Sequence, residues 1–78
     1  MTIEKLHEMI AEYQRNISAS ELLDMDRRKI AAVLESLGVS VYVLPKRTLV
    51  HVDGVDYVQT VEWDEREPRI VLIDPEAC

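Results

Sequence analysis

Apolar side chains recur every three or four residues along the start of the chain. Residues at this spacing share one side of an α-helix, so the pattern predicts an amphipathic helix over residues 2–15, with Thr2 as its N-cap. The apolar positions are Ile3, Leu6, Ile10, Tyr13 and Ile17.

Two shorter helices are predicted next. Ser18 is followed three residues later by a glutamate, the spacing of a capping box, which predicts a second helix over residues 19–24. Asp26 can cap a third helix over residues 27–37, and Gly38 stands where a left-handed C-cap favours glycine. The apolar stripe of this third helix is Ile30, Val33, Leu34 and Leu37.

After residue 38 the hydrophobic period changes from 3.6 to 2, which is typical of strands. Asp53-Gly54 favours a two-residue type I′ turn that pairs Val52 with Val55 and so sets the register. Residues 44–47 are expected to form another turn and the charged residues 64–68 a loop. The predicted strands are 39–44, 48–52, 55–63 and 69–73.

The sequence therefore predicts an α+β fold in a single domain, residues 1–78, with three N-terminal helices followed by a four-strand antiparallel meander. A domain this small buries only about 60% of the surface of its unfolded chain, so a homodimer is one way to cover more. Side chains alternate across a strand, and one face is expected to be the core. The members of that face are Val50, Val52, Val55, Tyr57, Val61 and Trp63.

Charge is unevenly distributed along the chain. The formal net charge is −6, but residues 15–52 carry six basic and four acidic side chains, whereas residues 53–78 carry two and eight. Five of the nine basic residues lie in two short clusters, residues 27–29 and 46–47. The first cluster opens the third predicted helix and the second lies in a predicted turn.

Residues 19–33 resemble the bihelical helix-turn-helix motif. Ser20 takes the small-residue position at the helix crossing and Asp26 the N-cap of the recognition helix, while Asp24 stands where that family usually has a turn glycine. Leu23, Met25, Ile30 and Val33 match the apolar packing positions. With the strand, basic turn and strand that follow, residues 1–53 resemble a winged helix-turn-helix module.

This resemblance implies a small regulatory protein that contacts duplex DNA, or a DNA-associated protein, through its recognition helix and the turn between its strands. The residues that match the outward-facing positions of the recognition helix are Arg27, Arg28, Lys29 and Ala32. Lys46 and Arg47 lie in the turn that corresponds to the wing.

An alternative uses the acidic side chains. Exposed carboxylates can imitate a phosphate array and cover the nucleic-acid-binding site of a host protein complex. Compact acidic α+β proteins of this size are similar in general character to phage-encoded inhibitors such as anti-CRISPRs and DNA mimics. The candidate contacts for that function are Glu4, Glu8, Glu12, Asp64, Glu65 and Glu67.

Catalysis is the class that the sequence favours least. The two glycines make no phosphate-binding loop, and His7, His51 and Cys78 lack metal-ligand spacing, so we expect no enzyme activity, cofactor or metal. The register places His51 opposite Asp56, which we interpret as a cross-strand pair. Without a signal sequence or a membrane-length apolar run, the expected location is the cytoplasm, and Cys78 is expected to be a bystander thiol.

Overall fold

The three helices begin where the sequence predicts their caps. In the computed structural model, which describes residues 1–77, the side chains of Thr2, Ser18 and Asp26 accept hydrogen bonds from backbone N–H groups three residues ahead, at 3.1, 3.2 and 2.9 Å. Each bond satisfies an N–H group that a helix start leaves unpaired. The helices are α1 (Ile3–Arg15), α2 (Ala19–Asp24) and α3 (Arg27–Ser36), the last ending one residue earlier than expected.

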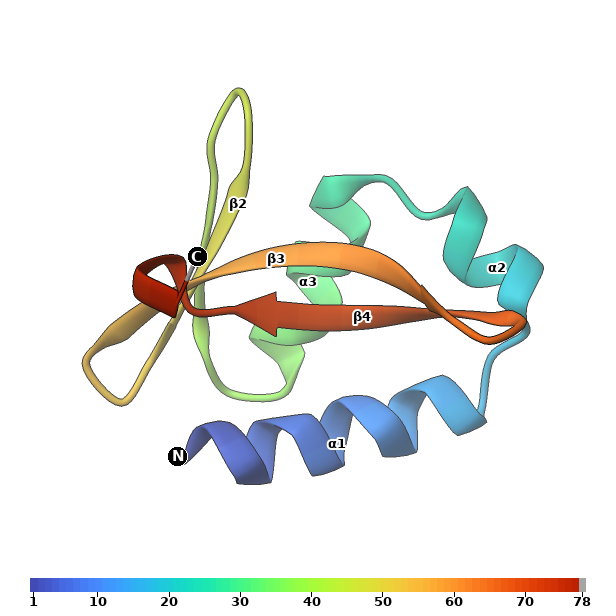
Figure 1. Ribbon diagram of the computed structural model, residues 1–78, viewed down its shortest axis with the longest axis horizontal. Coiled ribbons are helices and arrows are strands. Elements are labelled where there is room, and N and C mark those ends of the chain that lie inside the picture. The colour runs from blue at the N-terminus through green and yellow to red at the C-terminus, as the bar shows by residue number, and fades with distance from the viewer. Residues whose placement is uncertain (78) are drawn as a thin grey trace.

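The rest of the described chain forms the predicted meander (Figure 1). Its strands are β1 (Ser40–Val43), β2 (Thr48–Val52), β3 (Val55–Asp64) and β4 (Glu67–Ile73), followed by a 3₁₀ turn, η1 (Pro75–Ala77). Neighbouring strands pair antiparallel in the order β1-β2-β3-β4. The architecture is therefore α+β, with three N-terminal helices followed by a four-strand antiparallel sheet.

The turn between β2 and β3 fixes the register as predicted. Asp53 and Gly54 have φ angles of 49° and 83°, the positive values that a type I′ turn requires at both central positions. Val52 then pairs with Val55, and the β2–β3 ladder continues to Thr48 opposite Gln59.

The prediction of a charged loop over residues 64–68 is wrong. Pairing between β3 and β4 continues to Asp64 opposite Glu67, which leaves a two-residue turn whose first residue, Glu65, has a φ of 56°. Pro68 lies inside β4, an edge strand, where a missing N–H is tolerated if it points away from the sheet.

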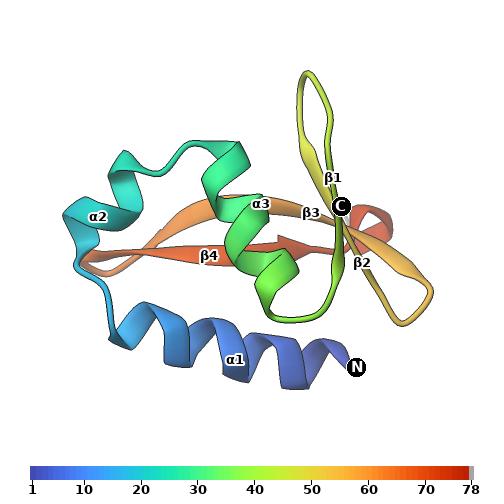
Figure 2. The same cartoon turned by 180° about the vertical axis from the view of Figure 1, so that it is seen from behind.

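Helices and sheet share one hydrophobic core. In Figure 1, α1 runs below β4 and α3 lies behind β3 and β4; Figure 2 shows the same arrangement from the other side. Alternate residues of the strands face the helices, as their burial shows. The buried apolar residues are Leu6, Ile10, Leu22, Ile30, Leu34, Val50, Val52, Ile70 and Leu72.

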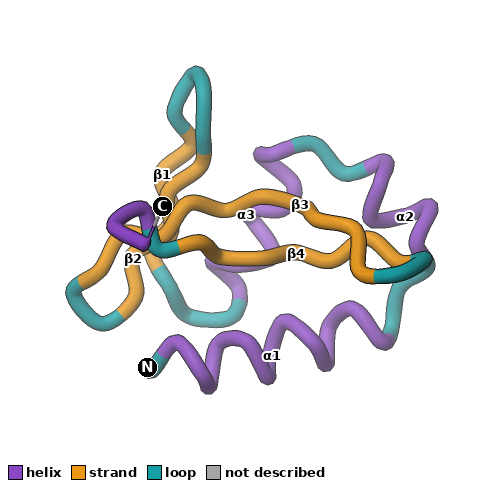
Figure 3. The backbone as a smooth tube through the Cα atoms, viewed as in Figure 1, coloured by secondary structure: helices purple, strands orange, loops and turns teal. Residues whose placement is uncertain are grey.

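The predicted core face of the sheet is only partly buried. Val50 and Val52 are buried, and Tyr57 and Val61 are half-buried against the core, but Trp63 is 63% exposed. Val55, 37% exposed, is also outside the core because it adjoins the β2–β3 turn. Trp63 is exposed because β3 and β4 extend as a two-stranded ribbon beyond the end of β2 (Figure 3).

Candidate functional site

A single side chain joins the two basic clusters. The guanidinium of Arg27, in the first turn of α3, donates hydrogen bonds to the carbonyl oxygens of Leu44 at 2.7 Å and Pro45 at 2.9 Å. These carbonyls belong to the β1–β2 turn, where the N–H of Leu44 also donates to the carbonyl of Arg47 at 2.9 Å. The fork geometry of a guanidinium suits it to two acceptors at once. These hydrogen bonds therefore hold the tip of the β1–β2 hairpin against the start of α3. Lys46 directly follows Pro45, one of the two residues bonded to Arg27.

The remaining cations of both clusters are free. Arg28, Lys29, Lys46 and Arg47 are exposed, and within residues 1–77 none of their side chains has a carboxylate within ion-pair distance. We call these four residues and Arg27 the basic surface. Its charge is not neutralised internally, because carbonyl groups solvate the Arg27 guanidinium without cancelling its charge.

The basic surface borders a hollow. A space of about 360 Å³ lies between the first turn of α3 and the hairpin tip, open to solvent. Its lining comprises Asp26, Arg27, Arg28, Val43, Leu44 and Pro45. Ala32 is exposed on α3, four residues after Arg28 and so on the same side of the helix. Of the six residues that match the helix-turn-helix contacts, Arg27 and Arg28 line the hollow, Ala32 shares the side of Arg28, and Lys46 follows the lining residue Pro45; Lys29 and Arg47 are exposed but do not line the hollow.

Basic residues in a first turn oppose the helix dipole, and Asp26 offsets this cost. Its Oδ1 accepts the N–H of Lys29 at 2.9 Å, and a carboxylate at an N-terminus interacts favourably with the dipole. The same carboxylate is the only acidic side chain that lines the hollow among the described residues. Asp26 therefore stabilises α3 while it reduces the positive potential of the basic surface.

The acidic candidates lie in two separate places, and several are paired internally. Glu8 lies 3.9 Å from Lys5, and Glu12 forms an ion pair with Arg15 on exposed turns of α1. Glu4 is also exposed on that helix. In Figures 1 and 2, α1 lies on the side of the molecule away from the β1–β2 hairpin tip.

The second acidic group lies at the β3–β4 turn. Arg69 lies 3.0 Å from Asp64 and 3.7 Å from Glu67, whereas Glu65 at the turn is exposed and has no ion pair within the described chain. Internal pairing lowers the density of free negative charge at both acidic sites.

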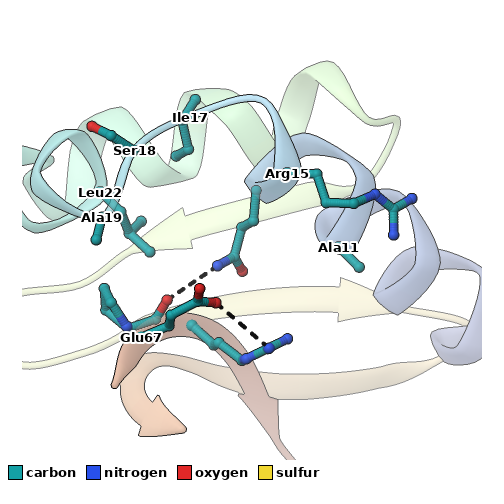
Figure 4. A pocket seen from close by; sticks show the side chains of 10 residues that line it. Ala11, Arg15, Ile17, Ser18, Ala19, Leu22 and Glu67 are labelled. Atoms are coloured by element: carbon teal, nitrogen blue, oxygen red, sulfur yellow. Dashed lines mark hydrogen bonds and ion pairs between the residues drawn. The ribbon is translucent and has the colours of Figure 1, made fainter. Parts of the chain in front are cut away.

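A second hollow has a structural explanation. It has a volume of about 400 Å³ and lies between the end of α1, α2 and the start of β4, as Figure 4 shows. The Gln14 amide spans it, donating to the carbonyl of Pro68 at 3.3 Å and accepting from the N–H of Ile70 at 3.0 Å. Gln14 thus pairs backbone groups on the free edge of β4, where Pro68 has no N–H to offer. Sequence reasoning missed this role, because it placed Pro68 in a loop and because Gln14 and Pro68 are 54 positions apart in the chain.

The predicted His–carboxylate pair forms on the surface of the sheet. His51 Nδ1 lies 2.7 Å from Asp56 Oδ1, as the register predicts, but both side chains are about half exposed. Within residues 1–77 no three His, Cys, Asp or Glu residues are grouped to hold a metal ion, and no helix there is long and apolar enough to cross a membrane. The expectation about Cys78 concerns a residue outside the described part of the chain.

Comparison with protein-family models, with curated proteins and with solved structures found no match for this chain. The helix-turn-helix resemblance therefore depends on the residues quoted above, and one of them departs from it: Leu23, expected at an apolar packing position, is 53% exposed.

Proposed function

We propose that the protein is a small regulatory module, winged-helix-like, that binds duplex DNA through the basic surface without catalysing a reaction. The observation that carries this proposal is the tie from Arg27 to the hairpin tip. It connects residues 18 positions apart, Arg27 and Pro45, and so brings the basic cluster of residues 27–29 toward that of residues 46–47. Lysine and arginine side chains in such a group bind phosphates and release counterions.

The hollow between α3 and the hairpin tip supports the same function. A phosphate backbone is a convex, negatively charged ridge, and the hollow offers a recess with Arg27 and Arg28 on its α3 wall. Lys46 directly follows Pro45, which lines the opposite wall. Ala32, one turn along α3, is a small side chain that would allow the helix to approach base edges closely. Phosphate contacts fix the position of a protein on DNA, and contacts to base edges supply sequence preference.

The acidic-inhibitor function is the second candidate. The paired state of Glu8, Glu12, Asp64 and Glu67 weakens it, because an imitation of a phosphate array needs free carboxylates. The observation that favours the acidic-inhibitor function is the exposed Trp63 beside the β3–β4 turn, since tryptophan is enriched in protein interfaces.

A charge-removal experiment tests the DNA proposal. Fluorescence anisotropy of a labelled random duplex should show weaker binding by the double variant Arg28→Ala/Lys46→Ala than by the unmodified protein. Arg66→Ala is the matched control, because Arg66 is an exposed cation at the β3–β4 turn without an ion pair in the described chain. Equal loss in the control and the double variant would contradict a localised DNA contact.

A further inference from the structure

β3 continues beyond the strand that pairs with it on one side. The β2–β3 ladder ends at Thr48 opposite Gln59, whereas β3 and its pairing with β4 continue to Asp64. Figures 1 and 3 show the β1–β2 hairpin turning away while the β3–β4 ribbon extends toward α2. The last residues of β3 therefore have a strand neighbour on one side only.

The direction of the backbone groups follows from the turn geometry. Val55 closes a two-residue turn and exchanges hydrogen bonds with β2, so alternate residues from Val55 onward face the β2 side. Val61 and Trp63 belong to this alternate set. Ile70, opposite Val61, directs its N–H away from β3, which independently confirms the alternation. Within residues 1–77, no hydrogen bond is recorded to the N–H and C=O groups that Val61 and Trp63 direct to this side.

An exposed anchor lies on this free edge. Trp63 is the only tryptophan of the chain and is 63% exposed, next to a row of unpaired backbone groups. Proteins usually protect such an edge, and β4 has Gln14 and Pro68 for that purpose. Val61 and Trp63 have no comparable protection in the described chain. Strand addition to a free edge is a recurrent way of recognising extended peptides.

The charge at this edge selects the partner. Glu62 and Asp64 project from the face of β3 opposite to Trp63, and Glu65 follows in the turn. Glu62 and Glu65 have no ion pair within the described chain. A second copy of this chain would place like charges beside each other, which is unfavourable between adjacent strands. A basic segment would gain from the same charges.

We propose that the free edge of β3 at Val61 and Trp63 accepts an extended segment of a protein partner as an added strand. The segment has apolar side chains toward Trp63 and basic side chains toward the unpaired Glu62, because alternate residues of a strand face opposite sides. This site is separate from the basic surface and does not depend on the DNA-binding proposal.

A blocked peptide of alternating valine and lysine is the probe. Because Trp63 is the only tryptophan, its emission reports binding directly, and we expect a saturable blue shift. The amide hydrogens of Val61 and Trp63 should exchange rapidly in the free protein. With peptide at about ten times its Kd, their exchange should slow by about tenfold.

Variants separate strand addition from general charge attraction. Glu62→Lys should weaken peptide binding, whereas Glu4→Lys, the same charge change on α1, should not. Trp63→Ala, followed with a labelled peptide and checked for folding by circular dichroism, should also bind more weakly. The proposal is overturned by an absence of binding, by equal binding of the matched valine–glutamate peptide, or by an emission shift without slower exchange at Val61 and Trp63.

Discussion

Replacing Arg27 tests how the basic surface is assembled. In Arg27→Ala, the carbonyls of Leu44 and Pro45 lose their donors, and the hairpin tip is no longer tied to α3. A hydrogen bond to a charged group contributes about 1.5–3 kcal/mol when buried, but Arg27 is exposed and solvent replaces part of that value. We therefore expect a loss of about 1 kcal/mol for the two bonds together, which lowers Tm by about 4–8 °C for a domain of this size.

Arg27→Lys separates geometry from charge. The lysine keeps the positive charge but presents a compact ammonium instead of a fork, so it cannot span both carbonyls in the same way. We expect Arg27→Lys to lose stability nearly as Arg27→Ala does and to bind duplex DNA more weakly despite its unchanged charge.

The assays are denaturant unfolding and amide exchange at the hairpin tip. The Leu44 N–H, bonded to the Arg47 carbonyl at 2.9 Å, should exchange faster in both Arg27 variants. Arg28→Ala is the matched control, because it removes an adjacent positive charge whose side chain makes no hydrogen bond or ion pair within the described chain. Equal stability and equal Leu44 exchange in Arg27→Ala and Arg28→Ala would refute the argument that Arg27 positions the tip.

Three other substitutions test the local arguments. Gln14→Ala should cost about 1–3 kcal/mol in urea unfolding, since it leaves the N–H of Ile70 without its acceptor on the β4 edge; an unchanged midpoint would contradict this role. Trp63→Ala should change stability by less than about 0.5 kcal/mol, as for an exposed residue, whereas a loss of several kcal/mol would place Trp63 in the core. Asp26→Ala should lower stability by about 1 kcal/mol through the lost cap on the Lys29 N–H and, by removing a negative charge, strengthen duplex binding; weaker binding would contradict the electrostatic account.

Local signals allowed much of the fold to be predicted. The caps at Thr2, Ser18 and Asp26 act within three residues, and the Asp53-Gly54 turn determines a whole strand register from two φ angles. Such signals depend on nearby residues alone, so they can be recognised without knowledge of the tertiary structure.

Burial and long-range contacts were harder to predict. The alternation of side chains along β3 places Trp63 on the face that was expected to be the core. Its exposure depends instead on where β2 ends relative to β3. The Gln14 bonds to β4 join residues 54 and 56 positions apart, and no pattern in the sequence predicts them. Both basic clusters of the candidate site could be predicted from the sequence. The hydrogen bonds of Arg27 that bring the clusters together could be seen only in the structure.

The salt dependence of duplex binding tests the central claim most directly. Each neutralised phosphate contributes about −0.9 to the slope of log K against log salt, so four free cations predict a slope near −3.6 and about a 150-fold loss between roughly 50 and 200 mM salt. Replacing Arg28, Lys29, Lys46 and Arg47 with alanine should bring the slope close to zero. Undetectable binding at low salt, or a slope that these replacements leave unchanged, would contradict DNA recognition by the basic surface.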